Sequence, residues 1–368
     1  MAKSRNVHKI GGSIIGVEMV CNNNASPESN HNTSPIIAVI DSGIDADYYR
    51  TRRDKFIKIL HFNLNGKAYY PECPADDNGH GTMCVDLISQ ICPSAKYYIL
   101  RILDKEKLGS TLSLLSALDY LHEVDVDIIH MSISVIKRDS NCKRIFSICS
   151  SLREQGKVLI CSVANGYKSS FPACLNCVLG VQGGMFDYKY GYSYRRGSSR
   201  ILCDATPIMV TGKENKLEFF SSNSKAASVA TGMIAESFKQ ATNDRQSISE
   251  FLKKQHYRNL KYYTWSKSEP PVINNLQPVN YNNYKWEATK VIEDICYLFG
   301  TTRVKLETLP YYSACEYISA DRFVQLFDWI NKRERLNISP HGMGYSDFEW
   351  LYSLLNYIDG LIGRGNNE

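Results

Sequence analysis

The sequence has no long hydrophobic run. Its first 20 residues include two basic residues near the start, but the apolar stretch that follows is short and is interrupted by glycines and Glu18. This pattern lacks the continuous apolar segment of a signal peptide. No window is long and apolar enough to span a bilayer. The sequence therefore predicts a cytoplasmic protein with no membrane partner.

The sequence also lacks a strong charge excess and a cysteine framework. A net charge of +5 is small for 368 residues, and no long basic run is present, so we expect no nucleic-acid partner. The twelve cysteines are scattered, which in a cytosolic chain is typical of small buried residues rather than disulfides. Cys174 and Cys177 form one close pair, but a zinc site would need further ligands at suitable spacing. We expect no metal and no cofactor, with a metal at this pair as the minor alternative.

No internal repeat is present, and the length favours two domains. Continuous apolar runs alternate with helical patterns, which predicts a mostly parallel sheet covered on both faces. The fold class is therefore expected to be α/β and doubly wound, with ligands at the carboxyl ends of the strands. The predicted strands are 35–40, 96–103, 126–133 and 158–163, and the predicted helices are 112–122, 147–154 and one that begins at Ser224.

The composition changes near residue 264, where prolines and asparagines replace the periodic apolar pattern. At least three helical patterns follow, which predicts a small C-terminal all-α domain. The segment Ser346–Glu349 reads as a capping box that opens the third of these helices. The predicted boundaries are 1–33 for an N-terminal extension, 34–262 for the α/β domain, 263–283 for a linker and 284–368 for the helical domain.

Three chemically reactive residue types stand at strand ends or helix starts. Asp41 follows the first strand in IAVIDSGID, His80 stands in NGHGT before a helix, and Ser224 opens the small-residue helix in SSNSKAAS. Aspartate, histidine and serine together are what nucleophilic acyl transfer requires. Asn165, which follows the fourth strand in SVANG, can supply an oxyanion donor. The simpler interpretations are a turn residue for Asp41 or Asn165, a loop residue for His80 and a polar helix start for Ser224.

The motifs VIDSGID, NGHGT, SVANG and SNSKAASVATG, in this order, resemble those of the subtilisin-like serine proteases, the subtilases of peptidase family S8. The family usually has D-[ST]-G, H-G-T and G-T-S-M-A-x-P, with an asparagine between the last two. The resemblance covers roughly residues 33–245. It implies a subtilisin-like sheet, a triad of Asp41, His80 and Ser224, and Asn165 in the oxyanion hole.

The segment DIIHMSIS is similar to the family's edge segment, which pairs with the substrate backbone. That likeness implies substrate binding by Ser132, Ile133 and Ser134. Ser134 stands where the family has glycine, and it is expected to crowd the wall of the main specificity pocket.

The serine motif itself departs from the family pattern. Ser222-Asn223 stands where the family has Gly-Thr, and Lys225 and Ser228 stand where it has Met and Pro. Lys225, like the pair Arg195-Arg196, is expected to be a solvated surface charge. These departures leave two interpretations open: an active protease, or a catalytically impaired subtilase that acts as a peptide-binding or scaffold protein.

The resemblance implies a serine endopeptidase, a hydrolase that cleaves a peptide or protein substrate through an acyl-enzyme. About 40 residues precede Asp41, too few for the folding pro-domain of secreted subtilases. We therefore expect a cytoplasmic subtilase that matures a specific peptide precursor, for example by removing the leader of a ribosomal natural product.

The C-terminal segment ISADRFVQLFDWINKRERLNIS is similar to the second-helix region of carrier domains. Arg322 stands where those domains have the serine that carries phosphopantetheine. The helical domain is therefore expected to be either a degenerate carrier-like module that docks a protein partner, or a generic helical appendage.

Overall fold

The computed structural model describes residues 34–135, 137–186, 188–194, 200–239, 272, 274–284 and 286–365. The predicted N-terminal extension, Arg195-Arg196 and residues 263–271 and 273 of the predicted linker lie outside these ranges. Among the described helices, none is long and apolar enough to cross a membrane.

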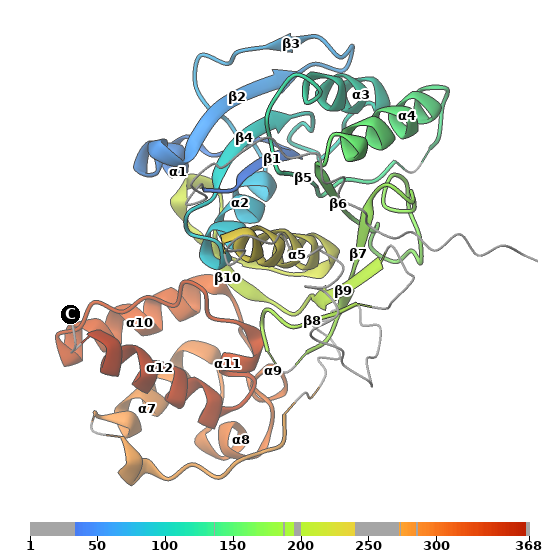
Figure 1. Ribbon diagram of the computed structural model, residues 1–368. Helices are drawn as coiled ribbons and strands as arrows, with labels where there is room; N and C mark the ends of the chain where they lie inside the picture. Colours follow the sequence, from blue (N-terminus) through green and yellow to red (C-terminus); the bar gives the residue numbers. More distant parts are fainter. Residues whose placement is uncertain are drawn as a thin grey trace, which may run out of the picture.

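A nine-stranded sheet forms the centre of the larger part of the chain (Figure 1). Its order is β3-β2-β4-β1-β5-β6-β7-β9-β8, and the pairing is parallel except at the two edges, where β3 and β8 run antiparallel. The strands are β1 (Ile36–Asp41), β2 (Phe56–Phe62), β3 (Ala68–Tyr69), β4 (Lys96–Arg101), β5 (Ile128–Met131), β6 (Val158–Ser162), β7 (Leu179–Gly184), β8 (Tyr192–Tyr194) and β9 (Arg200–Asp204).

Helices cover both faces of this sheet. The apolar core on one face includes residues of α2 and α5, and the core on the other face includes residues of α3 and α4. This arrangement confirms the predicted α/β class, because the apolar strands are buried on both faces. The helices are α1 (Ala46–Thr51), α2 (His80–Ile91), α3 (Thr111–Tyr120), α4 (Asn141–Glu154) and α5 (Ser222–Lys239), with 3-10 turns η1 (Arg53–Lys55) and η2 (Lys213–Asn215).

Two of the predicted helix starts were too late. Helix α5 begins at Ser222 rather than Ser224, and α4 begins at Asn141 rather than at residue 147. In both helices the first turn is polar, so the apolar periodicity that guided the prediction begins only after it.

The C-terminal part is a bundle of short helices, drawn in orange and red below the sheet in Figure 1. Its core is separate and rich in aromatic residues, among them Phe299, Tyr311, Phe323 and Phe348. The elements are η3 (Tyr281–Asn283), α7 (Ala288–Phe299), α8 (Arg303–Thr308), α9 (Tyr311–Ala314), α10 (Ala320–Glu334), α11 (Tyr345–Phe348) and α12 (Leu351–Gly365).

The predicted capping box at Ser346–Glu349 was wrong. The N-cap of the short helix α11 is Gly344, two residues before Ser346, and Asp347 accepts the N–H of Gly344 at 2.8 Å. Glu349 is buried and accepts hydrogen bonds from the backbone and side-chain amides of Asn274. The Ser-x-x-Glu spacing fits a capping box, but Glu349 instead binds Asn274, in the segment that leads into the helical domain.

A short hairpin lies between the sheet and the helical domain. It consists of β10 (Ile208–Thr211) and β11 (Leu217–Phe220) and leads directly into α5. Alternate side chains of a strand point to opposite sides, and here Phe220 joins the core that α2 and α5 share with the sheet, while Met209 and Phe219 contact the helical core. The hairpin therefore belongs to both cores.

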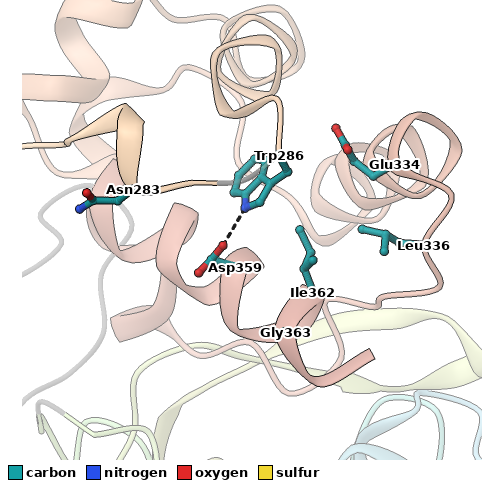
Figure 2. Close-up of a pocket in the computed structure, with 7 residues that line it drawn as sticks. All are labelled: Asn283, Trp286, Glu334, Leu336, Asp359, Ile362 and Gly363. Atoms are coloured by element: carbon teal, nitrogen blue, oxygen red, sulfur yellow. Dashed lines mark hydrogen bonds between the residues drawn. The ribbon is translucent and has the colours of Figure 1, made fainter. Parts of the chain in front are cut away.

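A pocket of about 450 Å³ opens on the helical domain. In Figure 2 the indole of Trp286 points toward Asp359, to which its Nε1 donates a hydrogen bond of 3.0 Å. The remaining lining residues are Asn283, Glu334, Leu336, Ile362 and Gly363.

Candidate active site

Asp41 and His80 meet at the carboxyl edge of the sheet. Asp41 is the last residue of β1, and His80 is the first residue of α2. The two are buried, and His80 Nδ1 lies 2.7 Å from Asp41 Oδ1. The backbone N–H of Ser42 also donates to Asp41 Oδ1 at 2.7 Å, which fixes the carboxylate.

At the start of α2, the backbone around Gly81 lies very close to the loop after β1. Gly79 takes a positive φ of 81°, and a Cβ on Gly81 would lie only 2.3 Å from the carbonyl oxygen of Gly43. The buried carboxylate of Asp76 accepts the N–H groups of Gly79 and Thr82. Glycines at these positions and one buried acid therefore hold His80 against the end of β1.

The interaction between His80 and Asp41 raises the pKa of the histidine and lowers the pKa of the aspartate. Burial by itself lowers the pKa of His80, but the Asp41 carboxylate favours the imidazolium, and the net pKa lies well above 6.5. Burial by itself raises the pKa of Asp41, but the charge and hydrogen bond of His80 outweigh it, and the pKa is lowered from 3.8. Asp41 is therefore ionised at neutral pH and holds the imidazole through Nδ1, which leaves Nε2 to act on a substrate or nucleophile.

Ser224 lies in the first turn of α5, half-buried, on the side of α5 that faces α2. A contact between Cys84 of α2 and Ser228 of α5, one turn further along both helices, indicates this placement. Cys84, four residues after His80, lies with its thiol 4.0 Å from His80 Nδ1 and interacts with the hydroxyl of Ser228. Ser228 is four residues after Ser224 and donates to its carbonyl oxygen at 3.0 Å. Since residues four apart share a helix face, His80 and Ser224 stand on facing surfaces.

Asn165 reaches the start of the same helix from the loop after β6. Its Oδ1 accepts the backbone N–H of Asn223 at 3.2 Å, and its Nδ2 lies 3.4 Å from Ser222 Oγ. Ser222 has a φ of 73°, a left-handed conformation that favours glycine. The side-chain amide of Asn165 is thus oriented at the N-terminus of α5, with its N–H₂ group directed toward the serine loop.

The three predicted substrate-binding residues follow β5 directly. Ser132 and Ile133 are buried and Ser134 is half-buried, so only the last of them has much exposed surface. The Oγ of Ser132 is buried and has no hydrogen-bond partner among the described residues. Just beyond them, the N–H of Val135 donates to the carbonyl oxygen of Phe171 at 2.8 Å, which closes the end of this segment.

Lys225, predicted to be a solvated surface charge, is fully buried instead. Its ammonium donates to Asp204 Oδ2 and, at 2.9 Å, to the carbonyl oxygen of Lys189. Burial lowers the pKa of Lys225 and raises the pKa of Asp204, while the attraction between them opposes both shifts. Asp204 gave no sequence signal, because it ends a short strand, β9, that the apolar runs did not reveal.

One cluster of metal-ligating atoms occurs in the described part of the chain. It joins Asp41, His80 and Cys84, whose ligand atoms lie within 4.8 Å of one another. Asp41 and His80 already satisfy each other there, so a metal would have to displace their hydrogen bond. Within the described ranges, neither Cys174 nor Cys177 belongs to such a cluster.

Comparison with known proteins agrees with this geometry. The subtilase family profile matches residues 32–270, which is more than half of the chain. The chain belongs to the subtilase family, and this confirms the predicted family and the subtilisin-like fold class. The fold and the family thus place residues 32–270 in the subtilisin-like class.

One similar protein is the Minor extracellular protease Epr of Bacillus subtilis (strain 168). It is 28% identical over 162 residues, which are 39% of this chain and 22% of the relative. The chain therefore spans about a fifth of the length of this relative.

The raised pKa of His80 predicts a specific pH dependence. His80 must be neutral to accept a proton, so the reactivity of Ser224 should rise with pH and reach half its maximum above pH 6.5. In Asp41→Asn the midpoint should move to lower pH, and the rate should fall on the order of 10⁴-fold. Second-order labelling rates with a fluorophosphonate, measured across pH, check both. A midpoint at or below 6.5 in the parent chain would contradict the raised pKa.

The raised pKa of His80 also determines how the free energy of unfolding changes with pH. Since the folded-state pKa of His80 is raised, the pair stabilises the fold fully below the unfolded pKa and loses this contribution as the pH rises through the folded pKa.

The variant Asn165→Asp tests the Nδ2 donor of the amide separately from its Oδ1 acceptor. The aspartate keeps an oxygen for the N–H of Asn223 but loses the N–H donor, so kcat should fall about 10²–10³-fold with little change in KM. Peptide hydrolysis kinetics measure this. Asn176→Asp, which adds the same charge at an exposed site, is the matched control and should behave as the parent. A large rise in KM with unchanged kcat would place Asn165 outside the oxyanion hole.

Proposed function

We propose that the chain is an active serine endopeptidase that uses Ser224 as nucleophile, His80 as general base and Asp41 to orient the imidazole. The observation that supports this best is the buried contact of 2.7 Å between His80 Nδ1 and Asp41 Oδ1, with Ser224 on the facing helix. Asp41 accepts a backbone N–H from Ser42 as well, which leaves its carboxylate fixed in the orientation that holds the imidazole.

The chemistry follows from the atoms at the site. Ser224 Oγ attacks the scissile carbonyl carbon while His80 Nε2 takes its proton, and the carbonyl oxygen becomes an oxyanion. The Nδ2 group of Asn165 and the backbone N–H at the start of α5 donate to this oxyanion. The imidazolium then protonates the leaving amine, and an acyl-enzyme forms on Ser224. Water, deprotonated by His80, hydrolyses the ester and releases Ser224.

We further propose that the substrate is a specific peptide precursor, such as the leader-bearing precursor of a ribosomal natural product, and that the protein acts in the cytoplasm. The support for a reducing compartment is that six of the described cysteines, among them Cys84, Cys149 and Cys161, are buried in the manner of small apolar residues. The half-buried Ser134, where the family has glycine, is consistent with a narrow rather than a general specificity.

The rival function is a catalytically impaired subtilase that binds peptides. Ser222 favours it, because a non-glycine residue occupies a left-handed conformation in the serine loop and its Oγ lies within 3.4 Å of Asn165 Nδ2. That contact occupies the donor that an oxyanion would need.

Labelling by a fluorophosphonate probe decides between the two, since the probe reacts with a serine that a base has activated. We expect the parent chain to be labelled, and Ser224→Ala and His80→Ala to lose labelling. Ser222→Gly is the matched control, because it lies in the same loop and glycine suits its φ of 73°. It should keep the label. A folded parent without label supports the rival function, and loss of label in Ser222→Gly alone would move the nucleophile to Ser222.

The substrate proposal needs its own test. Digestion of a denatured proteome-derived peptide mixture should give few cleavages at related sites, which mass spectrometry can identify. Broad cleavage without a shared sequence would contradict a precursor-specific role.

A further inference from the structure

The residue after the proposed nucleophile connects the active site to the helical domain. The buried ammonium of Lys225 binds the carbonyl oxygen of Lys189 at 2.9 Å. The ammonium of Lys189 in turn donates to the carbonyl oxygen of Gly342 at 2.7 Å and to Asp347 Oδ2 at 2.9 Å. Gly342 and Asp347 belong to the helical domain. Two hydrogen bonds in series, through Lys189, thus connect the first turn of α5 to Asp347 of α11.

The Lys189 side chain fits its site closely. A Cβ on Gly344 would lie 2.8 Å from Lys189 Cβ, so only glycine permits this approach. The carboxylate of Asp347 that receives the ammonium also accepts the N–H of Gly344, which fixes its orientation. Side-chain exposure is 19% for Lys189 and 23% for Asp347, so water weakens this ion pair less than it would on an open surface.

A second path leads through the β10–β11 hairpin to His80, at the start of α2. Phe219 contacts the rings of Phe323 and Phe348 in the helical core, with centroids 5.9 and 5.6 Å away. The next residue, Phe220, points the other way and places its ring edge-on to the His80 imidazole at 5.8 Å. Two residues of one strand therefore contact the helical core and the catalytic histidine.

The helical domain also pairs with the backbone of this hairpin. The N–H of Met209 donates to the carbonyl oxygen of Met343, and the N–H of Gly342 donates back to Met209. On the histidine helix, Asp86 lies 2.7 Å from Nε2 of His341, which comes from the same loop of the helical domain. Helix α2, which carries His80, thus contacts residues 341–347 directly, and α5, which carries Ser224, is linked to them through Lys189.

We propose that the helical domain is a positioning element of the active site, and that Lys189 and Lys225 are the positioning residues that link it to the turn bearing Ser224. The inference concerns the site of the proposed function and rests on it for its catalytic meaning. It assigns the C-terminal domain a role inside the enzyme that requires no external partner.

Lys189→Met in the full chain tests this link. Methionine keeps the aliphatic stem and the backbone carbonyl that Lys225 uses, but removes the contacts to Gly342 and Asp347. We expect faster hydrogen–deuterium exchange in peptides that cover the start of α5, together with a labelling rate and kcat lower on the order of tenfold at unchanged KM. Lys189→Arg should restore both, since a guanidinium can donate to the same two oxygens.

Lys216→Met is the matched control. Lys216 lies in the turn of the β10–β11 hairpin, and its ammonium is exposed and pairs with Glu214. This variant should exchange and react as the parent does. If Lys189→Met fails to fold by thermal melting, Asp347→Asn replaces it, because asparagine keeps an oxygen for the N–H of Gly344 while losing the charge.

The two readouts separate this inference from the proposed function. Exchange at α5 is measurable whether or not the chain is catalytic, so an unlabelled parent would refute the enzyme while exchange still decides the structural link. Unchanged exchange at α5 in Lys189→Met would overturn the inference. So would faster exchange with a labelling rate equal to that of the parent, because the link would then not position the nucleophile.

Discussion

The close contact between α2 and α5 is the constraint on which the site depends. Gly232 on α5 approaches Ile91 on α2 so closely that a Cβ would lie 2.8 Å from the isoleucine Cβ, and Ala226 and Ala227 are fully buried. Small residues let the two helices lie side by side on one face of the sheet. Both begin at the carboxyl edge, so their first turns bring His80 and the serine loop to the end of β1. A larger residue at 232 would separate the two halves of the proposed triad.

The buried ion pair of Lys225 and Asp204 is the second constraint, because burying two charges costs solvation free energy. Removing one partner of a buried pair destabilises a protein by about 3–5 kcal/mol, because the other charge is left without compensation. Asp204 is satisfied by Lys225, the hydroxyl of Thr206 and the N–H of Phe186, so the pair is well hydrogen-bonded. A hydrophobic residue after Ser224 would avoid this cost. The charge instead connects α5 to Lys189 and through it to the helical domain.

The sequence was sufficient for features set by local pattern. Apolar runs that end in Asp41 or precede Asn165 predicted parallel strands with polar groups at one edge, and the glycines around His80 predicted a tight helix start. Contacts between residues far apart in the sequence could not be predicted from local pattern. Lys225 looks solvated in SNSKAAS because its partner Asp204 is 21 positions away on a short strand. The role of Phe219 as a helical-core residue depends on Phe323 and Phe348, more than a hundred positions later.

The most direct measurement is to locate the residue that a fluorophosphonate modifies in the folded parent chain, by tandem mass spectrometry of its peptides. The geometry of α2, α5 and Asp41 predicts one adduct per chain, on Ser224. An adduct on Ser222, or a folded chain that forms none, would contradict the assignment of the nucleophile.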